Sequence, residues 1–167
     1  MPKQKKIDDP LLPVFTVGTV ARMLGISVQM LRLYEQRGLL LVKKSAGNQR
    51  LYSPTDVERL KCIRHAITEE KISIEGIRKI HALIPCWVHV NCPIEQRSIC
   101  PAYERNDAGC WTYKHQTNVC ADHNCHECEN YLLSSNCGEI KKLIRDRLMD
   151  RELESVLQHH AAKEPIE

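Results

Sequence analysis

The stretch "FTVGTVARMLGISVQMLRLYEQRGLL", residues 15–40, contains two short helical patterns joined by a tight turn. In the first pattern, apolar side chains recur at helical spacing at Val17, Val20, Ala21 and Leu24. The second pattern has its apolar stripe at Val28, Leu31 and Tyr34. A glycine follows each pattern, Gly25 and Gly38, where a left-handed helix end is favoured, and Ser27 stands at an N-cap position. These features predict a helix-turn-helix, whose second helix fits a major groove about 12 Å wide.

A predicted β-hairpin follows in "LLLVKKSAGNQRLYSPTDVERL", residues 39–60. Its apolar-rich ends flank a Ser-Ala-Gly-Asn turn, which is the pattern of a small two-stranded wing. Ser53, Pro54 and Asp56 then combine an N-cap, a proline at the first helical position and a capping acid, so a further helix is expected to begin here. A shorter helical pattern follows Ser73. The sequence thus predicts a mainly α fold, a winged helix-turn-helix with a small β wing.

The two halves of the chain differ in charge. Residues 1–85 contain 15 Lys and Arg against 8 Asp and Glu, whereas residues 86–167 contain 9 against 13. Between Phe15 and Tyr52 there are six basic residues and a single acid, Glu35. A merely solvated surface would mix the signs more evenly, so the first half favours nucleic-acid binding.

These residues resemble the MerR-type transcriptional regulators. The resemblance rests on "TVGTVARMLGISVQMLRLYEQRGLL", on the wing "GNQRLYSPTDV" and on the later "KISIEGIRKI", and it covers roughly residues 15–84. It implies a homodimer that binds an inverted-repeat operator in double-stranded DNA, with RNA polymerase as a further candidate partner and a C-terminal segment that receives the signal. A regulator of this kind is not an enzyme, and the sequence shows no poised catalytic base.

The resemblance also assigns DNA contacts. Base-contact positions at the start of the second helix are held by Ser27, Gln29 and Met30. Positions that match phosphate contacts are Arg32, Tyr34, Arg50 and Tyr52, and the wing adds the cations Lys43 and Lys44. Short polar side chains at a helix N-terminus can reach base edges, while cations and hydroxyls can hold phosphates. For the two tyrosines, packing beneath the wing is the alternative.

Pro85 interrupts any continuation of the last helix, and a cysteine-rich segment follows it. Seven of the nine cysteines fall within 43 residues: Cys86, Cys92, Cys100, Cys110, Cys120, Cys125 and Cys128. Too few aliphatic residues separate them for core packing to explain their number. The repeated Cys-Trp, with "CPAY" between and a closing Cys-x-x-Cys-x-x-Tyr, resembles the "two-CW" cysteine-rich module over residues 86–131.

Reduced thiols in this number predict a metal centre, which would supply folding free energy that so small a segment cannot obtain from its core. From Cys120 onward, C-x4-C-x2-C is the local spacing of a plant-type [2Fe-2S] loop, whereas zinc usually shows paired knuckles. We therefore predict an iron–sulfur cluster ahead of zinc, with redox sensing as the associated role and reversible disulfides as the third alternative. The first candidate ligand set is Cys110, Cys120, Cys125 and Cys128, and His123 and His126 are candidates for a mixed zinc site.

The last part of the chain, residues 137–160, has apolar residues at helical spacing among alternating charges. This pattern predicts an amphipathic helix that packs against a second copy or back on its own chain. No stretch is long and apolar enough for a signal peptide or a membrane span, so we expect a cytoplasmic protein that does not enter a membrane.

We divide the chain into a flexible tail at 1–14, a winged domain at 15–84, a cysteine module at 85–136, the amphipathic helix at 137–160 and a tail at 161–167. The predicted function is a MerR-type DNA-binding regulator whose activity is set by the metal centre of the cysteine module. The alternative is an electron-transfer or metal-storage protein that uses its helical domain to bind a protein partner.

Overall fold

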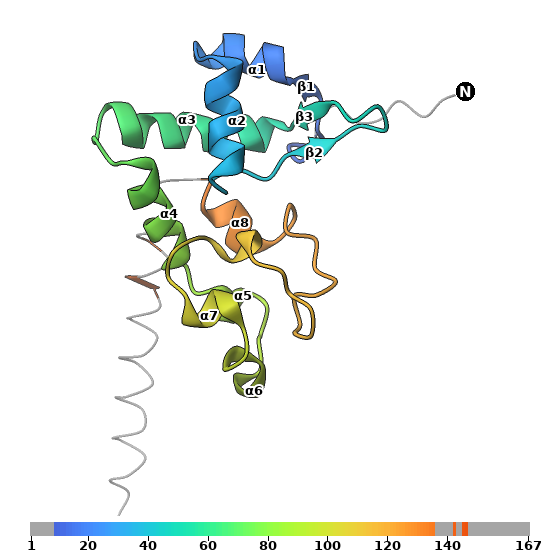
Figure 1. Ribbon diagram of the computed structural model, residues 1–167, viewed down its shortest axis with the longest axis vertical. Coiled ribbons are helices and arrows are strands. Elements are labelled where there is room, and N and C mark those ends of the chain that lie inside the picture. The colour runs from blue at the N-terminus through green and yellow to red at the C-terminus, as the bar shows by residue number, and fades with distance from the viewer. Residues whose placement is uncertain (1–8, 136–141, 143–144, 147–167) are drawn as a thin grey trace, which may run out of the picture. The chain divides into compact units, whose positions relative to one another are not determined.

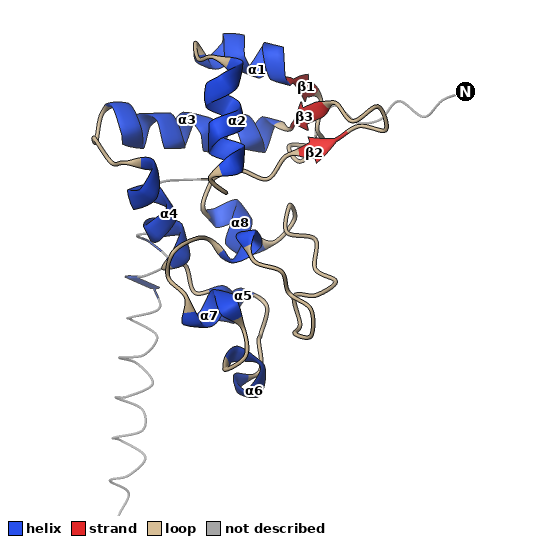
Figure 2. Cartoon of the chain, viewed as in Figure 1, coloured by secondary structure: helices blue, strands red, loops and turns tan. Residues whose placement is uncertain are grey.

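The computed structural model describes residues 9–135, 142 and 145–146, and it is mainly helical with one small sheet (Figures 1 and 2). Residues 1–136 form one compact unit and residues 137–167 a second. The predicted amphipathic helix at 137–160 and the tail at 161–167 lie outside the described residues, apart from residues 142 and 145–146. All contacts below belong to the first unit.

The predicted helix-turn-helix is confirmed by the first two helices, α1 (Val17–Leu24) and α2 (Val28–Gln36). Gly25 ends α1 with a positive φ of 61°, a left-handed conformation that glycine adopts without a steric penalty. The Ser27 side chain then caps α2 by accepting a hydrogen bond from the Met30 backbone N–H at 3.1 Å. The tight turn therefore follows directly from two local residue choices.

The predicted wing is also confirmed, and it forms part of a sheet of three strands. Strand β2 (Lys43–Lys44) pairs antiparallel with β3 (Arg50–Tyr52), and the turn between them uses a positive φ of 59° at Asn48. Strand β1 (Phe15–Thr16) pairs with the other edge of β3, so the strand order is β1-β3-β2. We did not expect β1, because two residues leave no alternating pattern and their partner strand is distant in sequence.

Residues 10–14 are part of this structure, whereas we expected them to belong to a flexible tail. The Val14 N–H donates to the Tyr52 carbonyl at 3.0 Å, which extends the β1–β3 pairing by one residue. Thr55 donates to the Pro10 carbonyl through both its backbone N–H and its hydroxyl. Pro10 and Val14 are therefore hydrogen-bonded to the winged domain.

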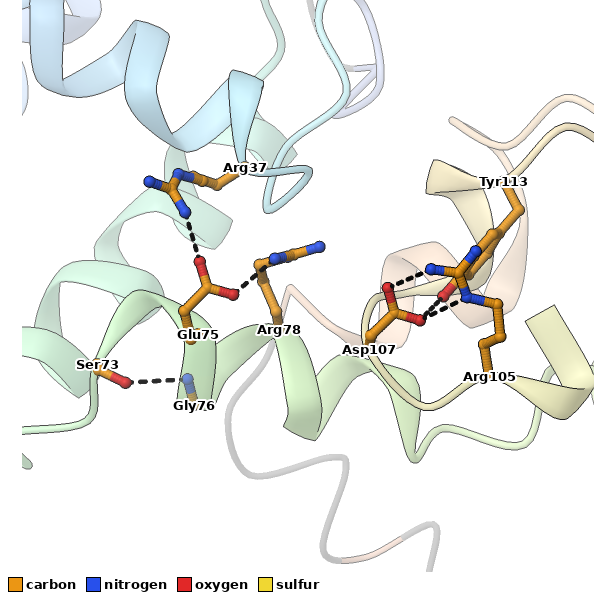
Figure 3. Close-up of polar contacts among 8 residues, drawn as sticks. All are labelled: Arg37, Ser73, Glu75, Gly76, Arg78, Arg105, Asp107 and Tyr113. Carbon is orange, nitrogen blue, oxygen red and sulfur yellow. Dashed lines mark hydrogen bonds and ion pairs between the residues drawn. The ribbon is translucent and has the colours of Figure 1, made fainter. Parts of the chain in front are cut away.

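Two further helices complete the winged domain, α3 (Pro54–Thr68) and α4 (Ile74–Ala82). The predicted capping box is present, since the Ser53 side chain accepts from the Asp56 N–H and the Asp56 carboxylate accepts from the Ser53 N–H. The core of the domain is built from buried residues of the four helices, the sheet and the connection between α2 and β2, which are Val20, Ala21, Leu31, Tyr34, Leu39, Leu40, Tyr52, Val57, Leu60, Ile63, Ala66 and Ile77. On the surface, the Glu75 carboxylate bridges Arg37, just beyond α2, and Arg78 on α4 (Figure 3).

The cysteine module has short helices joined by turns. They are α5 (Cys86–His89), α6 (Ile94–Arg97), α7 (Pro101–Glu104), the 3₁₀-turn η1 (Cys110–Thr112) and α8 (Glu129–Leu133). Its buried cluster contains only Trp111, Cys128 and Tyr131. So small an apolar cluster contributes little free energy of folding, and the module instead rests against the winged domain.

Arg59 of α3 joins the two parts. Its side chain is 0% exposed, and its guanidinium donates hydrogen bonds to the Ser134 hydroxyl and the Tyr131 carbonyl. The guanidinium carbon also lies 3.5 Å from the centroid of the Tyr131 ring and 5.6 Å from that of Trp111. Burial lowers the pKa of Arg59, so the hydrogen bonds and ring contacts compensate for a costly desolvation.

Replacing Arg59 with Ala should therefore lower the free energy of unfolding by about 3 kcal/mol, measured by urea denaturation, because buried partners lose a charged donor. Arg105→Ala is the matched control. Arg105 also lies over a tyrosine and pairs with a carboxylate, Asp107, but its side chain is 62% exposed (Figure 3). The control should leave stability nearly unchanged. Equal losses in both variants would contradict the assigned role of Arg59.

Candidate functional site

The N-terminal half of α2 presents the predicted base-contact residues to solvent. Ser27, Gln29 and Met30 are exposed, Met30 by 38%, and Arg32 is exposed one turn further along. On the wing, Lys44 is exposed and Lys43 is half-buried. The structure therefore gives this surface cations and polar side chains without a nearby excess of acids.

An open groove of about 400 Å³ lies between the helix-turn-helix and the wing. Its walls come from the end of β1 and the start of α1, from α2, and from the wing turn and β3. The lining residues are Thr16, Val17, Gly18, Arg32, Asn48, Gln49 and Arg50. Two of these residues are arginines and none is acidic. The groove thus joins α2, the recognition helix of the helix-turn-helix, to the wing on one concave surface.

Tyr34 and Tyr52, by contrast, do not lie on this surface. Their side chains are 3% and 0% exposed and belong to the core of the winged domain. Burial raises the pKa of Tyr34, and it raises the pKa of Tyr52 to about 12, so both phenols stay neutral. Packing beneath the wing, the alternative interpretation for both residues, replaces the phosphate contacts expected from the family resemblance.

Arg50 has an internal partner. Its Nε lies 2.6 Å from Oε2 of Glu35, the single acid between residues 15 and 52. This hydrogen bond raises the pKa of Arg50, and the Coulombic attraction of the carboxylate adds to the shift. The ion pair connects β3 to α2, so it fixes the wing relative to the recognition helix while leaving Arg32 and Lys44 as the exposed cations.

The seven cysteines of the module are free thiols, three of them buried and four half-buried. A side-chain hydrogen bond joins Cys86 and Cys110; it lowers the pKa of Cys86, and with burial it raises that of Cys110. Burial raises the pKa of Cys120 to about 12, and further increases come from the charges of Cys86, Cys128, Cys92 and Cys100. Each of these thiols would therefore make it harder for its neighbours to ionise, unless a cation were bound among them.

Two asparagine amides donate to sulfur in this region. Nδ2 of Asn130, a residue that is 0% exposed, lies 3.0 Å from Sγ of Cys110. Nδ2 of Asn118 lies 3.3 Å from Sγ of Cys100, while its Oδ1 accepts from the Cys120 N–H at 3.1 Å. Amide donors to sulfur stabilise thiolates, which are the form of cysteine that binds metals.

His115 is a potential donor that sequence reasoning missed. Its Nε2 lies 2.9 Å from the Cys110 carbonyl oxygen; because a carbonyl can only accept, Nε2 carries the proton. Nδ1 therefore carries a lone pair, which accepts from Nδ2 of Asn118 at 3.2 Å, and Sγ of Cys100 lies 3.9 Å from the same nitrogen. This tautomer and its second hydrogen bond are typical of metal-binding histidines. Its spacing from the neighbouring cysteines matches no short motif, so no signal in the sequence distinguished it.

Among the cysteines predicted as the first ligand set, the charge of Cys128 raises the pKa of each of the other three, Cys110, Cys120 and Cys125. Cys110 also has Cys86, a cysteine outside that set, as a hydrogen-bond partner. His126 stacks edge-on against Tyr131, with ring centroids 6.1 Å apart, and burial lowers its pKa. Within the described residues, no three or more His, Cys, Asp or Glu side chains already surround a common point that could hold a metal ion.

None of the helices in the described part of the chain has the length and apolar character that a membrane span requires.

Residues 15–83 match the family model described as MerR HTH family regulatory protein. These residues form a MerR-type helix-turn-helix domain. The MerR match ends before the first cysteine of the module, at the boundary where the helix pattern stops.

Similar proteins are transcriptional regulators by name, or a heat shock protein. The chain is 34% identical over 68 residues to the heat shock protein HspR of Streptomyces coelicolor, a match that covers 41% of this chain and 45% of HspR. It is 29% identical over 75 residues to the HTH-type transcriptional regulator GlnR of Bacillus anthracis, covering 45% and 57% of the two chains. It is 32% identical over 68 residues to the HTH-type transcriptional regulator ZntR of Escherichia coli, covering 40% and 48%. The chain thus spans about half the length of these relatives.

The MerR domain and the cysteine module share a buried titratable residue at their junction, His81 of α4. Its ring is 4% exposed and lies 5.3 Å, centroid to centroid, from that of Trp111. Burial lowers the pKa of His81 from 6.5 to about 3, and the Arg59 charge lowers it further in the same direction. His81 is therefore neutral in the folded protein near neutral pH.

This shift makes stability depend on pH. The unfolded chain binds a proton at His81 below about pH 6.5 but the folded chain does not, so stability is lost as pH falls towards 3. Between about pH 7 and about pH 5, His81 should account for about 2 kcal/mol of the decrease in unfolding free energy. In His81→Gln, this part of the decrease in unfolding free energy should be absent. In His65→Gln, where the replaced side chain is 60% exposed, the full decrease should remain. Identical pH profiles for wild type and His81→Gln would contradict this assignment.

Proposed function

We propose that the protein is a sequence-specific, DNA-binding transcription regulator whose binding responds to a metal centre in the cysteine module. The observation that carries the DNA-binding part is the groove of the MerR domain, which Arg32 of α2 and Arg50 of the wing line without any acidic residue. The other exposed side chains of α2 and the exposed wing residue Lys44 belong to the same two elements. An electron-transfer or storage role is not favoured, because the named relatives of the domain include transcriptional regulators.

The DNA contacts fall into two classes in this proposal. Ser27, Gln29 and Met30 at the exposed start of α2 read base edges, since a recognition helix uses its N-terminal residues for this purpose. Arg32, Lys43 and Lys44 neutralise phosphates. Arg50 contributes chiefly by holding the wing to α2 through Glu35. Tyr34 and Tyr52 are left out because they are buried.

One MerR domain presents one recognition helix, so it reads one half-site. Specific recognition of an inverted repeat then needs two copies of the chain, which makes a homodimer the proposed assembly. A dimer bound within a promoter has RNA polymerase as its proposed further partner.

The metal part of the proposal is supported by the chemistry of the donors. The donors are the seven free thiols Cys86, Cys92, Cys100, Cys110, Cys120, Cys125 and Cys128, and two asparagines donate to the sulfurs of Cys100 and Cys110. Thiolates suit an iron–sulfur cluster or zinc, with the cluster placed first because C-x4-C-x2-C from Cys120 is the local spacing of a plant-type [2Fe-2S] loop. His115 is proposed as a nitrogen donor beside Cys100. A bound centre would supply redox or metal responsiveness, while the chain's own residues hold the donors and transmit their positions.

The DNA-binding proposal predicts a change in salt dependence. For the DNA that wild-type protein selects from a random library, Lys44→Ala should lower the slope of log affinity against log salt by about 1, because one phosphate contact is lost. Lys114→Ala, an exposed lysine of the cysteine module, should leave the slope unchanged. Failure of wild-type protein to select any sequence, or equal slopes for all three proteins, would refute the proposed surface.

The metal proposal predicts the content of protein purified without oxygen. Iron, sulfide and zinc are assayed on one sample; near-stoichiometric iron and sulfide identify a cluster, and zinc alone identifies a zinc site. In either case His115→Ala should weaken metal retention against a chelator by about 10-fold to 100-fold. His65→Ala, at a side chain of α3 that is 60% exposed, is the control and should retain metal as wild type does. Protein free of all three elements would overturn the metal centre, and normal retention in His115→Ala would remove His115 from its ligands.

A further inference from the structure

Two aromatic residues of the cysteine module are hydrogen-bonded to the backbone of the MerR domain. Nε1 of Trp111 donates to the Gly38 carbonyl at 2.8 Å, and the Tyr131 hydroxyl accepts from the Leu41 N–H at 2.9 Å. The two rings also contact each other edge-on, with centroids 5.1 Å apart. Leu41 packs against the same buried cluster. The module therefore contacts one short segment of the domain, residues 38–41, through two hydrogen bonds to its backbone and the packing of Leu41.

This segment connects the recognition helix to the wing. α2 ends at Gln36 and β2 begins at Lys43, so the path of residues 38–41 sets where the wing stands relative to α2. Gly38 has a positive φ of 70°, and a Cβ built there would lie 2.5 Å from the methyl group of Thr112. The module thus approaches the backbone too closely for any residue with a side chain.

Both aromatic residues are also tied to the cysteines. Trp111 directly follows Cys110 in η1, and Tyr131 lies in α8, whose N-cap residue is Cys128. Asn130, between Cys128 and Tyr131 in this helix region, donates to the Cys110 sulfur. Movement of the Cys110 or Cys128 sulfur must therefore displace η1 or α8, and with them the two hydrogen-bonding groups.

We propose that Trp111 and Tyr131 are positioning residues for the DNA-binding surface, which couple the state of the cysteine module to the angle between recognition helix and wing. This inference rests on the proposed function. Because ligand binding and DNA binding bias the same segment, the coupling is reciprocal: DNA that fits the loaded form also tightens metal retention. The two residues act through backbone groups, so base specificity stays with the α2 side chains.

The test uses full-length protein in two states, as purified without oxygen and after metal removal with EDTA and ferricyanide followed by thiol reduction. The quantity measured is the ratio of the two affinities for the selected DNA. In wild type this ratio should be about 10-fold, a usual size for coupling between sites. Trp111→Phe and Tyr131→Phe, which keep an aromatic ring but delete the polar atom, should each lower it to below about 3-fold.

Trp87→Phe and Tyr103→Phe are the matched controls. These rings also pack edge-on in the cysteine module, with centroids 5.0 Å apart, and among the described residues no hydrogen bond links their side chains to the MerR domain. Both controls should keep the wild-type ratio. If Trp111→Phe and Tyr131→Phe also keep it, the inference is overturned while the proposed function stands. If wild-type protein does not bind DNA, or binds equally in both states, the proposed function fails and the inference fails with it.

A second pair of variants reaches the same segment from the MerR side. Gly38→Ala places a methyl group against Thr112, whereas Gly25→Ala has the same left-handed backbone but nothing within 4 Å of its Cβ. Both substitutions place a Cβ on a left-handed backbone, so both should lower the free energy of unfolding by a similar amount. Gly38→Ala should lose the response to metal removal, and Gly25→Ala should keep it. A response retained in both variants would count against the contact as the route of coupling.

Discussion

The buried guanidinium of Arg59 is the interaction on which the arrangement of the described structure depends. It is contributed by α3 of the MerR domain, yet its hydrogen-bond acceptors and ring partners belong to the cysteine module. A charge that is 0% exposed needs these partners, because desolvation without them would cost several kcal/mol. The need is mutual: α8 is held in place by the same contacts. The contacts of Arg59 orient the rings of Tyr131 and Trp111. That orientation in turn positions the hydrogen bonds that the two residues make to the backbone of residues 38–41.

The cysteine module shows why a thiol-rich segment needs such an anchor. Its buried cluster consists of Trp111, Cys128 and Tyr131, and its helices are four or five residues long. Helices of that length have no independent stability, and the apolar area is too small to replace it. The module can gain folding free energy from two other sources. One is its contact with the MerR domain, which is present in the structure. The other is the formation of metal–thiolate bonds, which we propose. A module stabilised in both ways would necessarily link its ligand to the domain that it touches.

Local features of the sequence predicted local structure well. The caps at Ser27 and Ser53, the left-handed Gly25 and the turn before Arg50 each depend on residues close in the chain, and all are confirmed. The burial of Tyr34 agrees with its place on the apolar stripe of α2, and the side chain lies in the core rather than on the surface that the family resemblance suggested. Helical periodicity was in this case the better guide, because it describes the side-chain direction itself.

Features that depend on long-range contacts escaped sequence reasoning. Arg59 was indistinguishable from other basic residues of an amphipathic helix, because its partners are more than seventy positions away. The pairing of Cys86 with Cys110 and the approach of His115 to Cys100 likewise depend on how loops fold over one another. The cysteine spacing within residues 120–128 therefore pointed to this module, but it could not show which of the donor side chains lie near one another.

The most direct measurement of the central claim is amide hydrogen exchange of residues 38–41 in metal-loaded and metal-free protein. The Leu41 N–H donates to Tyr131, so it should be protected when the module is loaded and exchange faster when the metal is removed. Peptides from the cysteine module itself report whether removal succeeded. Unchanged exchange at Leu41, while the module's own amides lose protection, would contradict the claim that the thiol site and the DNA-binding surface are mechanically joined.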